Sequence, residues 1–127
     1  MKKEHKFYIC KHCGNLVTFI NASGAQLTCC GEKMSEISPN TVDAAVEKHV
    51  PVVIVDGNTV TVEVGSVEHP MVPEHFIQWI YIETDKGFQI KYLEPSEKPK
   101  EVFTLNGEKL IAAYEYCNLH GLWKKEA

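Results

Sequence analysis

The sequence predicts a mainly β protein with two domains, and three observations support this prediction. In the second part of the chain, short segments of alternating apolar and polar residues are separated by turn signals about every 8–12 residues. Four of the five cysteines lie within the first thirty residues. A segment that small buries too little apolar surface to fold unaided, so a metal ion is expected to hold it together. We therefore predict a metal-stapled domain over residues 1–38 and an antiparallel β-sandwich over residues 39–127.

The composition of the chain limits which cellular compartment and which binding partners are expected. With 127 residues, 44% of them apolar, there is material for one modest core and a small appendage. No apolar run reaches the ~18 residues of a membrane span, and the basic start lacks the apolar stretch of a signal peptide, which predicts a cytoplasmic protein without a membrane partner. Cytoplasmic thiols stay reduced, so the cysteines are expected to be metal ligands or reactive groups. The net charge of −4, with interspersed signs, argues against nucleic acid.

The expected elements follow from these patterns in chain order. Residues 14–28 contain two short strand-like pieces around the turn "NASG", and "SPNT" at 38–41 reads as a connector. Residues 42–49 are expected to form a helical turn or a loop. Aromatic residues of the second domain are expected in its core or at the core margin, and "KKEA" is expected to be a frayed tail. The predicted strands cover residues 50–55, 59–64, 76–84, 88–93, 101–105 and 108–117, and the aromatic residues are Trp79, Tyr81, Tyr92, Phe103 and Tyr114.

The first candidate site is a set of four cysteines. The motif "CKHC" places two sulfurs around one ion, and the pair "CC" closes a tetrahedral shell that suits zinc or a single iron. Adjacent ligands are unusual, because the second half of such a site is commonly another C-x-x-C, and a vicinal pair strains its loop. A structural zinc knuckle therefore remains an alternative. His5 and His12 are expected to be solvated. The predicted ligands are Cys10, Cys13, Cys29 and Cys30.

The second candidate site combines the four remaining histidines with the fifth cysteine. Each lies at the edge of a predicted strand, where loops converge at one end of a sandwich. Four imidazoles and a thiolate are five ligands, one short of octahedral; zinc prefers four, so iron fits better. Blue copper is the weaker alternative, because no Met follows the last histidine and Met71 is expected to be packing. The predicted donors are His49, His69, His75, Cys117 and His120.

Six segments of the chain, taken in order, resemble desulfoferrodoxin, the two-domain class of superoxide reductase. They are "YICKHCGN", "TCCGEKM", "TVDAAVEKHVPV", "VGSVEHPM", "EHFIQWI" and "EYCNLHG", and they span residues 8 to about 121. The resemblance implies a desulforedoxin-like domain whose four cysteines hold iron, and an immunoglobulin-like sandwich whose second iron has four equatorial histidines and Cys117 as its axial ligand. It also implies a homodimer with two iron ions per chain.

The same resemblance implies an activity and two further residues. The reaction would be the one-electron reduction of superoxide to hydrogen peroxide, with electrons from a rubredoxin-like donor. Lys48 would steer the anion and hold a proton-donating water, and Glu47 would ligate the ferric iron after peroxide leaves. Two alternatives from other classes are a non-catalytic iron or copper electron-transfer protein and a zinc-stapled binding module.

Overall fold

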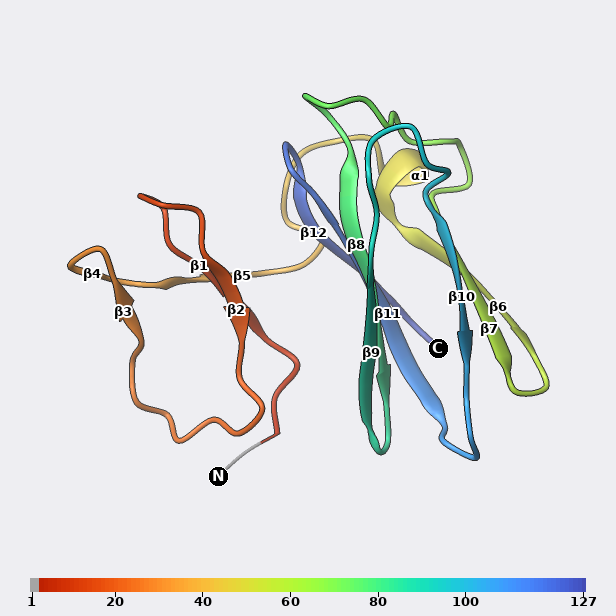
Figure 1. Cartoon of the computed structure of the whole chain (residues 1–127), viewed down its shortest axis with the longest axis horizontal. Coiled ribbons are helices and arrows are strands. Elements are labelled where there is room, and N and C mark those ends of the chain that lie inside the picture. Colours follow the sequence, from red (N-terminus) through yellow and green to blue (C-terminus); the bar gives the residue numbers. More distant parts are fainter. Residues whose placement is uncertain (1–2) are drawn as a thin grey trace. The chain divides into compact units, whose positions relative to one another are not determined.

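The computed structural model describes residues 3–127, so the first two residues of the predicted first domain lie outside the described residues. The chain divides into two compact units between Ser38 and Pro39 (Figure 1). Among residues 3–127, no helix has the length and apolar character needed to span a bilayer. Each unit is described by itself below.

The N-terminal unit is built from very short strands. Strand β1 (Phe7–Ile9) lies between β2 (Leu16–Thr18) and β5 (Ser35–Ile37), and both pairings are antiparallel. A separate hairpin joins β3 (Thr28–Cys29) to β4 (Glu32–Lys33). Only Phe7, Cys10 and Met34 are buried apolar residues among those described in this unit. Such a small core agrees with the expectation that a metal holds the unit together.

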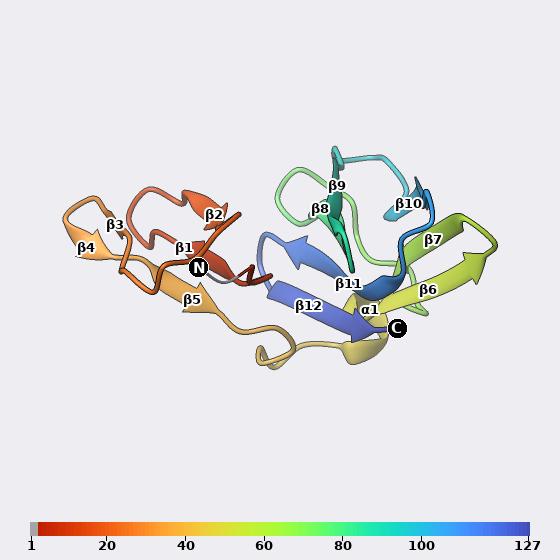
Figure 2. The same ribbon diagram turned by 90° about the horizontal axis from the view of Figure 1, so that it is seen from below.

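The C-terminal unit is an antiparallel β-sandwich, as predicted. One sheet has the order β10-β7-β6 and the other the order β12-β11-β8-β9. Figure 2 shows β6, β7 and β10 on one side of this unit and β8, β9, β11 and β12 on the other. The short helix α1 (Val46–His49) precedes the first strand. The strands are β6 (Pro51–Asp56), β7 (Thr59–Val64), β8 (Ile77–Thr84), β9 (Gly87–Tyr92), β10 (Lys100–Thr104), β11 (Leu110–Cys117) and β12 (Gly121–Glu126).

The core lies between the two sheets. Alternate residues of β7, namely Val60, Val62 and Val64, are 0–1% exposed and belong to one cluster with Ile80 and Ile82 of β8. A register shift interrupts the β8–β11 ladder: Tyr116 pairs with Trp79, but the next residue, Cys117, pairs with Ile77. One step on β11 therefore spans two residues of β8, which is a β-bulge. The bulge brings Cys117 into the core beside the start of β8.

Two expectations for the sandwich are wrong. Residues 121–126, which include most of the predicted frayed tail, form strand β12, and Trp123 of this strand pairs with Glu115 of β11. Leu122 and Trp123 are adjacent and are followed by two lysines, so the segment shows no apolar–polar alternation that would indicate a strand. Tyr92 is 79% exposed, whereas the other four aromatic residues are buried as expected. It ends β9, an edge strand in which no residue is buried.

Glu115, in strand β11 of the second sheet, is a buried carboxyl group that lowers the stability of the fold. Its side chain is 0% exposed, and neither carboxylate oxygen has a hydrogen-bond partner among residues 3–127. Burial raises its pKa well above the ordinary value, because removal from water disfavours the charged carboxylate. An unsatisfied buried polar group destabilises the folded state.

We expect Glu115→Leu to raise the free energy of unfolding by about 1–3 kcal/mol, because leucine fills a similar volume without an unsatisfied polar group. Urea unfolding of the metal-loaded protein measures this. The control Glu94→Leu, at an exposed loop position, should change stability by no more than about 0.5 kcal/mol. A Glu115→Leu protein less stable than wild type would show that the carboxyl group has a stabilising partner.

Candidate metal centres

The four cysteines of the N-terminal unit form one cluster, and their sulfurs lie within 4.8 Å of one another. Cys13 Sγ is 3.6 Å from Cys29 Sγ, and the sulfurs of Cys29 and Cys30 are 4.0 Å apart. Cys10 is buried, and the loop that follows it is closed by two backbone bonds, from Gly14 N to Cys10 O at 2.9 Å and from Cys10 N to Asn15 O at 2.8 Å. The backbone therefore presents the first cysteine pair to the second.

The hairpin turn between β3 and β4 explains the adjacent pair. Thr28 pairs with Lys33 and Cys29 with Glu32, so the two-residue turn consists of Cys30 and Gly31. Both have positive φ, at 54° and 77°, as a type I′ turn requires. The strain predicted for the vicinal pair is thus located at Cys30, a non-glycine residue in the left-handed region. The tight turn keeps its sulfur close to that of Cys29.

The pKa shifts of the cysteines indicate that the four thiols favour binding of a cation. Hydrogen bonding from the backbone N–H of Cys13 lowers the pKa of Cys10 to about 6, whereas interaction with the Cys13 side chain raises the pKa of Cys30 to about 12. All four sulfurs therefore become thiolates together only when a metal ion compensates their charge. His12 lies outside the sulfur cluster, with Nε2 3.1 Å from Glu32 Oε2, as expected of a solvated side chain.

The second cluster lies at one end of the sandwich, where helix α1, the connection between β7 and β8, and the turn between β11 and β12 converge (Figure 1). One donor ends helix α1, two lie in the connection between β7 and β8, one ends β11, and one lies in the turn to β12. Their donor atoms all lie within 4.8 Å of one another, so the structure brings together all five predicted residues: His49, His69, His75, Cys117 and His120.

Three ring nitrogens and the sulfur lie at short mutual distances. His49 Nε2 is 3.0 Å from His69 Nε2 and 3.1 Å from His120 Nδ1. Cys117 Sγ is 3.5 Å from His69 Nε2 and 3.9 Å from His120 Nδ1. His75 Nε2 is buried and has no hydrogen-bond partner among the described residues. Such an orphaned nitrogen is a further sign that the cluster is built for an ion.

The protonation of two histidines is set by backbone carbonyls. His49 Nδ1 donates to Ala45 O and His69 Nδ1 donates to Pro70 O, each at 2.7 Å. Burial lowers the pKa of His49, and it lowers the pKa of His69 to about 4, so both rings are neutral. Each Nε2 then carries a bare lone pair, and the two lone pairs face each other. A metal ion satisfies both, and the carbonyls orient the rings from behind.

Cys117 is fully buried, and burial raises the pKa of its thiol above the ordinary value. Hydrogen bonds from the backbone N–H groups of His120 and Leu119 act in the opposite direction. A bound cation would complete the conversion to thiolate. Trp123 covers the cluster by stacking on His49, with ring centroids 4.9 Å apart. The donor set of four imidazoles and one thiolate fits iron better than zinc.

Sequence reasoning missed one residue that supports this cluster. Asn118 Oδ1 accepts from Phe76 N and its Nδ2 donates to Glu74 O, both at 3.0 Å. The side chain thereby fastens the loop that carries His75 to the end of β11. Its place between Cys117 and His120 in "CNLH" is the only sequence signal. Met71 accepts from Ile77 N through its sulfur at 3.4 Å, which agrees with the expected packing role.

Glu47 and Lys48 lie on α1, directly before His49. The Lys48 side chain is half-buried near the cluster; burial lowers the pKa of His75 most, and the charges of His120 and Lys48 add to this effect. Glu47 is exposed, and its carboxylate is not part of the donor cluster. The structure therefore places the lysine beside the candidate centre and leaves the glutamate at its periphery.

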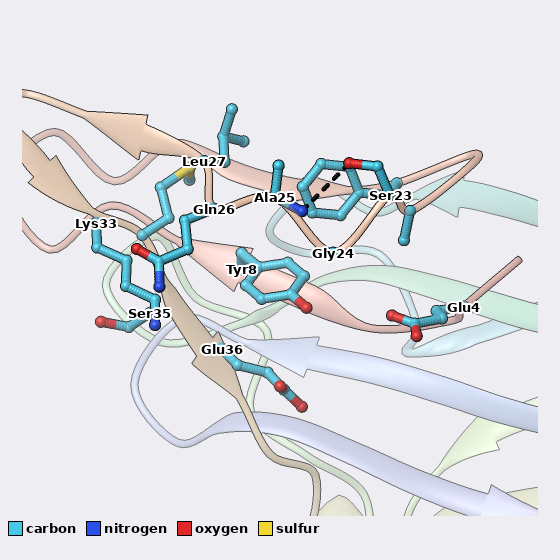
Figure 3. A pocket seen from close by; sticks show the side chains of 13 residues that line it. Glu4, Tyr8, Ser23, Gly24, Ala25, Gln26, Leu27, Lys33, Ser35 and Glu36 are labelled. Carbon is cyan, nitrogen blue, oxygen red and sulfur yellow. Dashed lines mark hydrogen bonds between the residues drawn. The ribbon is translucent and has the colours of Figure 1, made fainter. Parts of the chain in front are cut away.

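A cavity of about 470 Å³ in the N-terminal unit belongs to neither centre. Figure 3 shows Tyr8 in it, with Gln26 and Lys33 at its wall and the Ser23–Ala25 turn, closed by a 3.2 Å bond from Ala25 N to Ser23 Oγ. No cysteine or histidine lines it. The chemistry-bearing residues thus lie elsewhere.

Fold and donor sets together define a class: a β-sandwich metalloprotein with a non-haem four-histidine, one-cysteine centre and a separate four-cysteine unit. The family model "Desulfoferrodoxin" matches residues 41–126, and "Desulfoferrodoxin, N-terminal domain" matches residues 2–37. The chain therefore belongs to the desulfoferrodoxin family. The family and the two donor sets fit two iron centres.

Individual relatives agree with this assignment. The chain is 45% identical over 127 residues to the desulfoferrodoxin of Nitratidesulfovibrio vulgaris, with 100% of each chain covered. It resembles the crystal structure of the superoxide reductase from Treponema pallidum with a TM-score of 0.80 and 41% identity, over 95% of this chain and 98% of that one. A superoxide reductase (1Fe-SOR) from Giardia intestinalis matches with a TM-score of 0.55 and 29% identity, over 64% of this chain and 97% of that one. The non-catalytic alternative is not favoured.

We expect Asn118→Ala to weaken metal binding at the histidine cluster by about 10–100-fold, because the loop that carries His75 loses both hydrogen bonds to the Asn118 side chain. Titration of metal-free protein with Fe²⁺ under anaerobic conditions measures the iron affinity of each of the two sites. Asn58→Ala, in the exposed turn between β6 and β7, is the control and should bind as wild type does. Unchanged affinity in Asn118→Ala would mean that the loop holds its position without these bonds.

Proposed function

We propose that this chain is a superoxide reductase, which converts superoxide, one electron and two protons into hydrogen peroxide. The observation that carries the proposal is the set of four imidazoles and one thiolate, of which His49, His69 and Cys117 are buried, with Lys48 beside it on α1. The names of the relatives from Treponema pallidum and Giardia intestinalis support it. Iron bound by His49, His69, His75, His120 and Cys117 would supply the electron.

The residues around the donor set have separate tasks in this proposal. The carbonyls of Ala45 and Pro70 hold His49 and His69 in the tautomers that leave Nε2 free. Lys48 supplies local positive charge to a protein with a net charge of −4, attracts the anion, and holds a water that delivers protons. Glu47, on the same helix turn, would offer a carboxylate ligand to the oxidised iron.

The remaining assignments concern the other unit and the surroundings of the protein. We propose that residues 1–38 form a domain in which Cys10, Cys13, Cys29 and Cys30 hold a second iron. Its main role would be structural, with redox activity as an additional role. The boundary near Ser38 would then separate two metal domains. A rubredoxin-like carrier would donate electrons, and the protein would work as a cytoplasmic homodimer.

Replacement of Lys48 tests the catalytic part of the proposal. Lys48→Ala should lower the second-order rate constant for superoxide by about 10–100-fold at low ionic strength and flatten its salt dependence, because the attracting charge is lost. Pulse radiolysis of the reduced, iron-loaded protein measures both. The control Lys86→Ala, in the exposed turn between β8 and β9, should leave both unchanged. Unaltered superoxide consumption in Lys48→Ala would favour an electron carrier instead.

Replacement of the thiolate tests the metal assignment. Elemental analysis should find about two irons per wild-type chain purified from iron-replete cells and about one in Cys117→Ser, because a serine hydroxyl is a poor replacement for the thiolate. Superoxide reduction should be lost, while the absorption of the four-cysteine centre persists. Wild-type activity in Cys117→Ser would refute the thiolate's role, and one zinc with no iron in wild type would return the chain to the binding-module alternative.

A further inference from the structure

Gly65 lies where the backbone after β7 passes against helix α1. Its φ is +79°, and a Cβ atom placed on it would lie 2.6 Å from Glu47 O, 2.7 Å from the carbonyl carbon of Lys48 and 2.7 Å from Val67 O. All three are backbone atoms, which cannot swing aside as a flexible side chain can. The close approach of these two segments therefore requires glycine at this position.

The loop after Gly65 holds the peptide between Glu47 and Lys48. Val67 N donates to Glu47 O at 2.9 Å, and Ser66 Oγ donates to the same oxygen at 3.3 Å. This one carbonyl thus accepts two bonds from the 65–67 loop. Because the loop follows β7 directly, the peptide is attached to a regular strand of the sandwich.

Helix α1 cannot hold this geometry by itself. It has four residues and no side-chain hydrogen bond at its N-cap. Helices of one turn have no intrinsic stability in water, so tertiary contacts decide where its side chains point. Lys48 and Glu47 depend on this single turn for the direction of their side chains.

We propose that Gly65 is a positioning residue for superoxide reduction: it admits the 65–67 loop to the backbone of α1, and the loop fixes the direction of Lys48 and Glu47. The proposal rests on the proposed function, since both side chains matter only if superoxide is the substrate. It adds a residue that contacts neither the donor atoms nor the anion. A side chain at position 65 would push α1 away and turn the lysine out of place.

The chain offers a matched control for the test. Gly107 has a φ of +82°, nearly that of Gly65, but a Cβ atom there would meet nothing within 4 Å. Gly65→Ala and Gly107→Ala therefore share the cost of an alanine in the left-handed region. Only the first adds the collision with α1, so differences between the two variants report the contact.

The first measurement is hydrogen exchange at the Val67 amide, which does not depend on activity. In iron-loaded protein, Gly65→Ala should speed this exchange by about tenfold or more, because the bond to Glu47 O opens. Gly107→Ala should leave it unchanged. Equal exchange in the two variants would overturn the proposed contact, whatever the enzyme does with superoxide.

The second measurement is the superoxide rate constant in a double-mutant cycle with Lys48→Ala. Gly65→Ala should lower the rate about tenfold and flatten its salt dependence, and Lys48→Ala should then add little, because the lysine is already misplaced. In the Gly107→Ala background the full effect of Lys48→Ala should remain. Additive effects of Gly65→Ala and Lys48→Ala would overturn the positioning role.

Two outcomes separate this inference from the function it rests on. If wild-type protein does not reduce superoxide, the proposed function fails, while the exchange result still decides whether Gly65 holds α1. If Gly65→Ala does not fold, Ser66→Ala removes one bond to Glu47 O without backbone strain. Ser66→Ala should lower the superoxide rate constant about two- to threefold and reduce its salt dependence by a similar factor. A rate constant and salt dependence equal to those of wild type would count against the proposal.

Discussion

The structure at the end of the sandwich depends on two imidazole nitrogens that face each other with no proton between them. His49 Nε2 and His69 Nε2 are 3.0 Å apart, and each ring carries its proton on Nδ1, where it donates a hydrogen bond to a backbone carbonyl. Buried neutral rings in this arrangement repel each other unless a cation lies among them. The cluster is therefore a site that only a metal ion satisfies, and the surrounding elements serve to keep it in that state.

The sandwich supplies the rigidity for this arrangement. Strand ends and short connections bring five donors together from distant parts of the chain, and the bulge in β8 admits Cys117 beside them. Asn118 fastens the loop of His75, while the loop after Gly65 fastens the turn of Lys48. Glu115, two residues before Cys117, is buried without a hydrogen-bond partner among residues 3–127, and it shows that this part of the sheet accepts a local cost in stability.

Sequence patterns were informative where chemistry depends on residue type and spacing. Alternation predicted the hairpin of β6 and β7, and the donors lay at predicted strand edges, so their convergence could be expected before the fold was known. Strand β12 could not, because its apolar signal is limited to Leu122 and Trp123. The exposure of Tyr92 follows from the order of strands in the sheet, which alternation within one strand does not reveal.

The supporting residues were beyond sequence reasoning for a different reason. In the sequence Gly65 resembles an ordinary turn glycine. Only the structure shows that a Cβ atom at this position would lie 2.6 Å from a backbone oxygen of α1. In the same way, the bonds from Asn118 to the 74–76 loop join residues more than forty positions apart. Such contacts depend on tertiary geometry, which a single sequence does not show.

The most direct test of the metal assignment is a crystal structure of iron-loaded protein with anomalous diffraction recorded at the iron absorption edge. We predict two iron peaks per chain, one among the four cysteine sulfurs and one within bonding distance of Cys117 Sγ and a nitrogen of each of the four histidines. A single peak at the cysteines, with the histidine nitrogens hydrogen-bonded to each other or to water, would contradict the account.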